Sequence, residues 1–401
     1  MKMLSHQESS ALAQIDQSPM LAQVQSWAAI NSGSSNLAGL AITAQMLADA
    51  FAVLPGNIEL ATPNSTERVR SDGMVENISH GKHLILNVRP DAPVQMLFTG
   101  HMDTVFAANH PFQTLQWLEE GILNGPGVAD MKGGIAVMLA ALIAVETAAP
   151  QNFGYQVLIN SDEEIGSPSS APLIAQMAKG KIAALTYEPA LPDGTLAGAR
   201  AGSGNFSINV SGKSAHAGRN PEEGRNALIA AADLALRLKA LTQEGLSVNP
   251  ARIEGGSPNN VVPDQAILRV NLRPHSPELE IYADRQIRSL IEKIEQEHDV
   301  SIHLHGGFGR PPKPISDGAA KLFGLVKKCG EDLGMTIGWR STGGVCDGNN
   351  IAACGVPVVD TMGVRGGSIH SADEYLITES LSERARLSAL TILRIAEKGS
   401  L

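Results

Sequence analysis

Cysteine, aromatic residues and positive charge are all in short supply in this sequence. Its three cysteines, Cys329, Cys346 and Cys354, have no C-x-x-C spacing, so they provide no disulfide framework and fit a reducing compartment. Aromatic residues make up 4 %, which suits tightly packed helices on a parallel sheet better than a β-sandwich. The 31 Lys and Arg are outnumbered by 41 Asp and Glu. That balance argues against a nucleic-acid or anionic-membrane partner, because either would be bound by a basic surface.

Long hydrophobic runs are missing as well. The first residues, MKMLSHQESSALAQ, lack the apolar core of a signal peptide. We find no uninterrupted apolar stretch that is long enough to span a bilayer. We therefore expect a cytoplasmic protein that does not bind membranes.

The sequence does contain enough apolar material for two or three domains. Its 401 residues are 43 % hydrophobic and 18 % charged, a composition that can bury a sizeable core. The runs VQMLFT, YQVLIN and IAALTY are predicted strands, and the stretches from Gly133 and from Pro168 to about Lys179 are predicted helices. This β-α-β-α-β order predicts a parallel sheet that is covered by helices.

From about Ala199 the pattern changes to alternating apolar and polar residues. NFSINVSG is typical of a strand with one wet face, and a helix is predicted from about Glu222 to Leu241. Two strands around ARIEGG and AILRVNLR, a helix from about Pro277 to His298 and the strand VSIHLHG complete the segment. This β-α-β-β-α-β order is that of a ferredoxin-like unit.

The α/β pattern resumes from about Asp317, with a helix, the strand TIGW, a short helix near Asn350, the strand PVVDTM and a last helix from about Glu379. The sequence therefore predicts an α/β protein whose main domain has three layers and a mostly parallel sheet. This domain comprises residues 1–198 and 316–401, and a smaller ferredoxin-like α+β domain is inserted at 199–315. The segments LPDGTLAG and RPPKP are the expected hinges.

Candidate metal ligands follow the ends of the predicted strands. In open α/β sheets, sites form outside the carboxyl ends of the strands, so side chains placed there converge on one edge of the sheet. Their convergence is stronger evidence for a site than any one of them alone. The residues are His101, Asp103, Asp130, Glu163, Glu164, Glu188 and His370.

The chemistry of these residues matches zinc, since imidazole and carboxylate suit a divalent ion of borderline softness. Two histidines and three carboxylates can hold two ions if one carboxylate bridges, and two metals can polarise a carbonyl and lower the pKa of a shared water. Asp130 is suited to bridging because flanking glycines let the backbone approach closely. Asp103 can orient the ring of His101 through its second nitrogen.

Glu163 and Glu164 need separate roles. On an extended strand end, neighbouring side chains point in opposite directions, so one acid can face the metals and the other the substrate. A carboxylate near a metal-bound water can take a proton from it and later return that proton to the leaving amine.

Seven segments together resemble the M20 metallopeptidase family, which includes glutamate carboxypeptidases, acylases and desuccinylases. They are GHMDTV, GPGVADMKGG, SDEEIGS, YEPA, SGKSAHAG, PNNVVP and IHSADEYL, in the family's order over nearly the whole chain. The resemblance implies two Zn²⁺ ions per subunit, for which Co²⁺ or Mn²⁺ can substitute, and Glu163 as the catalytic base. The metal ligands that it implies are His101, Asp130, Glu164, Glu188 and His370, with Asp130 bridging.

Other residues that the resemblance implies lie in the inserted domain. His216 resembles the family histidine that reaches across a dimer to stabilise the oxyanion, which implies a homodimer formed through this domain, and the domain also acts as a lid. Asn260 and Arg273 resemble residues that bind the substrate carboxylate, and Arg suits that role through its two-pronged geometry. Glu188 stands where carboxypeptidases and deacylases of the family tend to have Glu and aminopeptidases tend to have Asp.

A glycine-rich loop adds to the implied substrate site. Thr342, Gly343 and Gly344 resemble a loop whose backbone amides face the same carboxylate. The sequence departs from the family pattern at Cys346, where a small or hydroxyl residue is more usual. The loop GVRGG is a second departure, and its Arg365 can touch substrate. These differences leave the substrate open.

Several of these residues also have an ordinary structural alternative. Asp130 can cap the following helix, which is compatible with bridging two metals. Glu163 and Glu164 can form a solvated turn, and Arg273 at a strand end can pair with a nearby surface acid.

The reaction that fits best is hydrolysis of the amide bond between an acyl or peptidyl group and a C-terminal amino acid, as in a glutamate carboxypeptidase. One alternative is an N-acyl-amino-acid deacylase of the acetylornithine deacetylase and desuccinylase type. Another is an inactive protein that binds peptides or acyl amino acids on the same scaffold. A serine hydrolase is excluded, because no G-x-S-x-G nucleophile elbow occurs.

Overall fold

The computed structural model describes residues 4–148 and 151–401 and contains a central six-stranded sheet. Four neighbouring strands, β8, β5, β9 and β16, run parallel, whereas β4 is antiparallel to β8 and β1 to β4. The mostly parallel sheet is therefore confirmed. In order, the strands are β1 (Asn57–Ala61), β4 (His83–Val88), β8 (Phe153–Asn160), β5 (Val94–His101), β9 (Ala183–Thr186) and β16 (Val358–Val359).

Helices cover both faces of this sheet and give the three predicted layers. Phe98 of β5 packs into a core shared with α4, whereas its neighbour Leu97 faces a second core with Ile174 of α5 and Ile351 of α9. Alternate residues of a strand thus serve opposite layers. The helices are α1 (His6–Leu12), α2 (Gln17–Ala28), α3 (Leu37–Phe51), α4 (Gly134–Thr147), α5 (Ala171–Ala178), α8 (Asp317–Asp332), α9 (Asp347–Ala353) and α10 (Ser380–Lys398).

One helical segment, Val128–Thr147, is long and apolar enough to cross a membrane by length and composition, although Asp130 and Lys132 interrupt it. Its most apolar window is 89 % buried inside the fold. A helix that is hydrophobic on all sides is expected at the centre of a large core. Burial within the protein therefore accounts for its composition.

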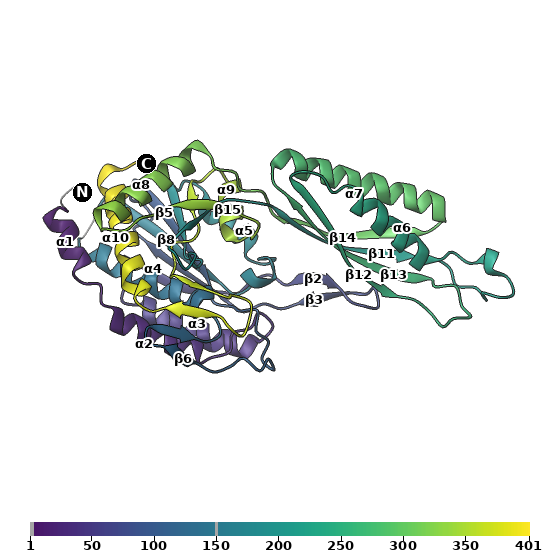
Figure 1. The fold of residues 1–401 in the computed structure, drawn as a ribbon, viewed down its shortest axis with the longest axis horizontal. Coiled ribbons are helices and arrows are strands. Elements are labelled where there is room, and N and C mark those ends of the chain that lie inside the picture. Colours follow the sequence, from purple (N-terminus) through teal and green to yellow (C-terminus); the bar gives the residue numbers. More distant parts are fainter. Residues whose placement is uncertain (1–3, 149–150) are drawn as a thin grey trace.

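The segment after residue 200 folds as the predicted β-α-β-β-α-β unit. Its antiparallel sheet has the order β12-β13-β11-β14, and α6 and α7 pack on one face around a separate core. Figure 1 shows this unit at one end of an elongated molecule, with α1 and α10 at the other end. The boundaries at 199 and 315 remain a prediction. The elements are β11 (Ser203–Ser211), α6 (Ala227–Lys239), β12 (Leu246–Gly255), β13 (Gln265–Pro274), α7 (Pro277–His298) and β14 (Ser301–Arg310).

Three smaller sheets were not predicted from the sequence. The hairpin of β2 (Thr66–Val69) and β3 (Val75–Ile78) reaches across to the inserted sheet (Figure 1), where the Val69 carbonyl accepts a 2.8 Å hydrogen bond from Arg269. A parallel pair joins β10 (Leu196–Arg200) to β15 (Trp339–Thr342). The third sheet has the order β17 (Gly366–Gly367), β18 (Tyr375–Ile377), β7 (Ile122–Asn124) and β6 (Gln116–Glu119).

Three predicted elements begin later than expected. The helix predicted from Pro168 begins at Ala171. The strand predicted at TIGW lies at Trp339–Thr342, because the chain first pairs with β10 at Trp339. The helix predicted from about Glu222 begins at Ala227. A short turn occupies Pro221–Glu223, and the Asn226 side chain then caps α6 by accepting from the backbone of Ile229.

Candidate metal centre

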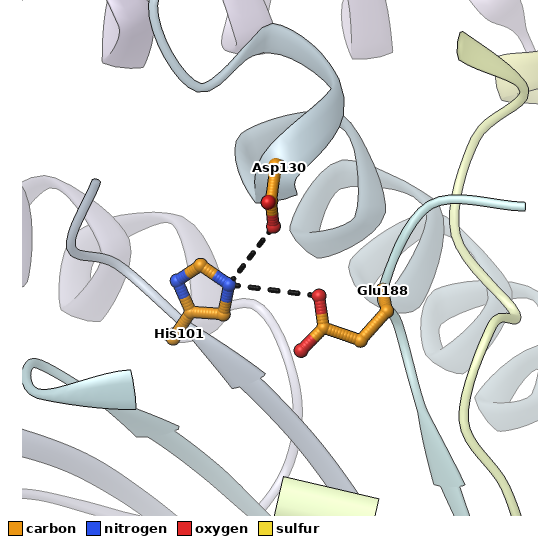
Figure 2. Close-up of side chains that lie close together, drawn as sticks. All are labelled: His101, Asp130 and Glu188. Atoms are coloured by element: carbon orange, nitrogen blue, oxygen red, sulfur yellow. Dashed lines mark hydrogen bonds and ion pairs between the residues drawn. The ribbon is translucent and has the colours of Figure 1, made fainter. Parts of the chain in front are cut away.

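A histidine and two acids meet at the carboxyl end of the parallel strands. His101 is the last residue of β5 and is 1 % exposed. Its Nε2 lies 3.1 Å from Oδ1 of Asp130 and 3.6 Å from Oε2 of Glu188. Figure 2 shows the three side chains pointing toward one another. Asp130 precedes α4, and Glu188 follows β9. Three elements that are far apart in sequence therefore place a cation-binding set at one point, as the strand order predicts.

The second cluster uses the other oxygen of the same aspartate. Nε2 of His370 lies 3.2 Å from Oδ2 of Asp130 and 3.2 Å from Oε2 of Glu164. Each Asp130 oxygen therefore faces one imidazole nitrogen. Each of the two clusters also contains one further carboxylate, Glu188 in the first and Glu164 in the second. This arrangement of nitrogen and oxygen donors fits two divalent cations that share a carboxylate. The structure thus brings together all five predicted ligands.

The charge balance of the cluster attracts cations. His370 donates hydrogen bonds to the carboxylates of Asp130 and Glu164, and these bonds raise its pKa to about 10. Burial lowers the pKa of His101, but Glu188 and the neighbouring aspartates outweigh it and hold that pKa well above the usual range. Burial, together with the charge of Asp130, raises the pKa of Glu164 to about 7. The acids therefore exceed the available positive charge, and a metal ion would relieve their repulsion.

Asp103 contacts the site differently from the prediction. Nδ1 of His101 donates to the backbone carbonyl of Asp103 at 2.9 Å, whereas the carboxylate lies 3.5 Å away. The ring is therefore held in the tautomer that leaves Nε2 free as a ligand. The Asp103 carboxylate accepts instead from the backbone amides of Glu163 and Glu164, both at 3.2 Å, and from Ser34 at 2.7 Å. It fixes the turn that carries the two acids.

The separation of Glu163 and Glu164 has a different origin from the predicted one. The pair lies in a short helical turn, Glu163–Ile165, and not on an extended strand end. Glu164 faces His370, whereas Glu163 accepts a 2.6 Å hydrogen bond from Nη2 of Arg310. Burial raises the pKa of Glu163 well above its usual range, and Arg310 opposes this shift. The turn thus directs Glu164 toward His370 and Glu163 toward Arg310.

A cavity of about 1150 Å³ opens over the centre. Arg273 lines it together with Gly343 and Gly344, and its guanidinium donates to the carbonyl of Gly343 at 3.4 Å and to Asn271 at 2.9 Å. Both partners are neutral, so the Arg273 charge remains free to meet a substrate carboxylate. The predicted surface ion pair of Arg273 has no counterpart among the described residues. The acids that line the cavity are Asp130, Glu163, Glu164 and Glu188.

Three other candidate residues lie elsewhere. His216 and Asn260 are neighbours, since the amide of Ala217 donates to the Asn260 carbonyl at 2.9 Å, but the cavity lining found in the described chain includes neither. Arg365 does not line the cavity either. Its guanidinium pairs with Glu379 at 2.6 Å and Glu383 at 3.1 Å. The expectation that Arg365 touches substrate is not supported by this geometry.

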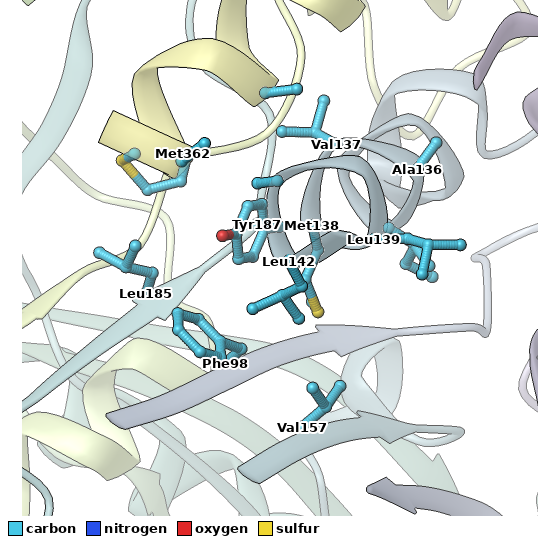
Figure 3. Packing of buried hydrophobic residues seen from close by; sticks show 14 of the residues in the cluster. Phe98, Ala136, Val137, Met138, Leu139, Leu142, Val157, Leu185, Tyr187 and Met362 are labelled. Carbon is cyan, nitrogen blue, oxygen red and sulfur yellow. The ribbon is translucent and has the colours of Figure 1, made fainter. Parts of the chain in front are cut away.

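The start of α4, which follows Asp130, packs closely against the end of β9 and against β5. A Cβ atom on Gly134 would lie 1.9 Å from the carbonyl oxygen of Tyr187, so only glycine lets α4 begin this close to the end of β9. Figure 3 shows the following residues of α4, among them Met138 and Leu142, packed over Phe98 of β5. The close backbone approach expected at the flanking glycines is present at Gly134, whereas the bridging role of Asp130 stays a prediction.

Glu374 is a residue that sequence reasoning missed. It is 1 % exposed, and its Oε1 accepts from the backbone amides of Ala129 and Asp130 while Oε2 accepts from Gly127, all at 3.0 Å. Burial, with the charge of Asp130, raises the pKa of Glu374 to about 7. The carboxylate therefore holds the loop that presents the shared aspartate. The motif IHSADEYL contains this residue, but nothing in the sequence assigns its partners.

Comparisons with known proteins match most of this chain. The model of "Peptidase family M20/M25/M40" matches residues 97–394. Carboxypeptidase G2 of Pseudomonas sp. (strain RS-16) is 31 % identical over 340 residues, which is 81 % of this chain and 79 % of that protein. Succinyl-diaminopimelate desuccinylase of Janthinobacterium sp. (strain Marseille) is 28 % identical over 304 residues, 70 % of this chain and 78 % of the relative.

A solved structure shows the same fold at lower identity. A tripeptidase from Staphylococcus aureus superposes with a TM-score of 0.73 at 23 % identity, over 96 % of this chain and all of its own. The family match covers most of the chain and runs from within β5 to within α10, so it includes all five candidate ligands. The chain belongs to peptidase family M20/M25/M40, a family of metallopeptidases and amidohydrolases.

Proposed function

We propose that this protein uses two Zn²⁺ ions to hydrolyse the amide bond between an acyl or peptidyl group and a C-terminal amino acid. The observation that carries the proposal is the shared Asp130, whose two oxygens lie 3.1 and 3.2 Å from the Nε2 atoms of His101 and His370. Glu188 completes the donor set on the first side and Glu164 on the second. Nitrogen and carboxylate donors suit zinc, and Co²⁺ or Mn²⁺ can take the same ligands.

In the proposed mechanism, Glu163 is the general base and later the general acid. Two such ions, when bound, polarise the scissile carbonyl and lower the pKa of the attacking water. Glu163 lines the cavity but belongs to neither ligand set. It accepts a proton from the attacking water and delivers this proton to the nitrogen of the leaving amine. Arg273, which also lines the cavity, orients the free carboxylate of the substrate.

The specificity that we propose is that of a carboxypeptidase with an acidic leaving group. A further arginine, Arg340, lines the cavity in addition to Arg273, and this positive charge suits a leaving group such as glutamate. Arg200 also lines the cavity, but its charge is balanced by Asp360. The carboxypeptidase relative, at 31 % identity, supports this proposal. The alternative is an N-acyl-amino-acid deacylase, which the desuccinylase relative at 28 % identity supports.

We further propose a homodimer formed through residues 199–315. His216 and Asn260 lie outside the cavity of their own chain, so they would complete the site of a partner. Strand β12 is an edge of the inserted sheet, and the nearby helix α6 exposes 56 % of Ile229 and 72 % of Leu236. Unpaired strand edges and exposed apolar side chains are features of interfaces. The free thiols fit the cytoplasmic location that we propose.

The test is amino-acid release from a panel of N-acyl amino acids and short peptides, with zinc-loaded protein and a chelated control. Metal-dependent release of glutamate or aspartate from peptidyl and aroyl substrates is the expected result. Preferential hydrolysis of N-acetyl or N-succinyl amino acids would favour the deacylase. Absence of release from every member at full metal occupancy would contradict the hydrolase and favour a binding protein.

A further inference from the structure

Arg310 is a buried cation that belongs to the inserted sheet but reaches the acids of the main domain. It is the last residue of β14 and pairs in register with Ser203 of β11. The residue is 3 % exposed. Its position is therefore set by the inserted sheet, whereas its guanidinium lies beside Glu163.

The guanidinium makes contacts with four residues of the main domain. Nη2 donates to the Glu163 carboxylate at 2.6 Å, to the Glu163 carbonyl at 3.2 Å and to Ser167 at 3.0 Å. Nη1 donates to Asn350 at 2.7 Å and forms an ion pair with Asp347. Arg310 thus holds both the side chain and the backbone of Glu163, and it ties them to the start of α9.

Charge explains why this contact fixes the acid. Asp347 is buried and the Glu163 side chain is only 10 % exposed, so the two acids would repel each other without a cation between them. A planar guanidinium can donate to both acids at once with a fixed geometry, whereas a lysine ammonium is a single point charge on a flexible chain. Removing the guanidinium would leave Glu163 free to adopt other rotamers.

The two chain segments that connect the main domain to the inserted sheet are bonded to each other near Arg310. The backbones of Arg200 and Lys313 exchange hydrogen bonds of 2.9 and 3.0 Å, so the two connecting segments run side by side. Both side chains also pair with the buried Asp360, at 2.8 Å for Arg200 and 3.1 Å for Lys313. This clamp fixes the direction in which β14 leaves the inserted sheet, and with it the place of Arg310.

We propose that Arg310 is a positioning residue that aligns Glu163 for proton transfer and makes this alignment depend on how the inserted sheet is seated. The inference rests on the proposed function, in which Glu163 is the base. It assigns Arg310 no contact with the substrate. Arg310 holds Oε1 of Glu163, and the other carboxylate oxygen, Oε2, remains available to accept and return the proton.

The experiment compares two variants, Arg310→Lys and Asn350→Ala. Asn350 accepts a hydrogen bond from the Arg310 guanidinium but does not line the cavity, so Asn350→Ala loosens Arg310 without changing the cavity wall. Arg269→Lys is the matched control, since Arg269 forms an ion pair with Glu254 at 2.8 Å on the same sheet, away from the cavity. Steady-state kinetics are measured on the substrate that the wild type hydrolyses best. The absorption spectrum of the Co²⁺-loaded proteins reports the metal ligands independently of turnover.

For Arg310→Lys we expect kcat to fall about 10- to 100-fold with KM within about twofold of the wild type, because a small misplacement of a catalytic group costs this much. Asn350→Ala should show a smaller fall in kcat at unchanged KM. The Co²⁺ spectra should match the wild type, and Arg269→Lys should leave both constants unchanged.

Other outcomes would overturn the inference in distinguishable ways. A rise in KM at unchanged kcat in Arg310→Lys would make Arg310 a substrate contact, and unchanged kcat in both variants would remove any positioning role. If Arg310→Lys does not fold by circular dichroism, Asn350→Ala decides alone. A wild-type protein that hydrolyses nothing would instead refute the proposed function and this inference with it.

Discussion

Replacing Glu374 by glutamine should weaken metal binding without touching a metal ligand. Its two carboxylate oxygens accept three backbone hydrogen bonds of 3.0 Å, from Gly127, Ala129 and Asp130. In Glu374→Gln, an NH₂ group replaces one oxygen and faces a backbone N–H, which is also a donor. At least one buried amide of the loop that carries Asp130 then loses its acceptor.

The size of the effect follows from this count. A buried donor without a partner costs about 1–3 kcal/mol, and about 1.4 kcal/mol corresponds to a factor of ten in an equilibrium constant. The loop can escape this cost only by moving, which displaces the shared Asp130. We therefore expect metal affinity to fall about 10- to 100-fold, the usual range for residues that support metal ligands.

The assay is competition with a chromophoric chelator, which gives the successive zinc dissociation constants of each variant. Glu379→Gln is the matched control, because Glu379 pairs with Arg365 on the surface and its side chain is 74 % exposed. That variant should bind zinc like the wild type. A folded Glu374→Gln protein with zinc affinity within twofold of the wild type would refute the reasoning.

Four further predictions follow from the roles assigned above. Glu163→Gln should keep its full metal content and lose about 10²- to 10⁴-fold in kcat, because the attacking water loses its base; zinc content and turnover are measured together. His370→Ala should retain about one zinc ion per chain by elemental analysis, since His101 and its partners remain. Arg273→Lys should raise KM about tenfold or more, because hydrogen bonds between charged groups contribute about 1.5–3 kcal/mol, and a neutral-amide substrate should show no such rise. Zinc affinity should rise with pH, by about tenfold per pH unit for each proton that the metal displaces. The reason is that His370, with a pKa of about 10, and Glu164, with a pKa of about 7, hold protons that compete with the metal. A zinc affinity that does not change with pH would contradict this prediction.

The same pKa of His370 has the opposite consequence for the metal-free protein. The pKa of His370 is about 10 in the folded protein and 6.5 for an unperturbed histidine. The protonated ring therefore stabilises the metal-free fold, and this stabilisation is fully present at pH values below the unperturbed pKa. This contribution is lost as the pH rises through about 10. Alkaline pH therefore favours zinc binding while it weakens the chelated protein.

The sequence predicted the sheet, the layers and the inserted unit because their signals are local. Helix α7 was expected at Pro277–His298, where it lies, since Ser276 caps it and its apolar residues repeat with a helical period. The strands of the smaller sheets could not be found in this way. The hairpin of β2 and β3 is short and polar, and its hydrogen bonds to Arg269 and Gln265 join residues about half the chain apart.

The meeting of the five candidate ligands was predictable, because the carboxyl ends of parallel strands share one edge of the sheet. The groups that support them were not. Glu374 acts through backbone amides, which leave no trace in residue type. Arg310 meets Glu163 across a sequence separation of 147 residues, and only the seating of the inserted sheet brings them together. The role proposed for His216 requires a partner chain, so it remains a proposal.

Stepwise addition of zinc to the chelated protein, with turnover recorded at each step, tests the central claim most directly. The account predicts negligible hydrolysis without metal and a rise in activity that reaches its plateau at two zinc ions per chain, as two clusters that share Asp130 require. Full activity at one zinc ion per chain, or hydrolysis that persists in the chelated protein, would contradict it.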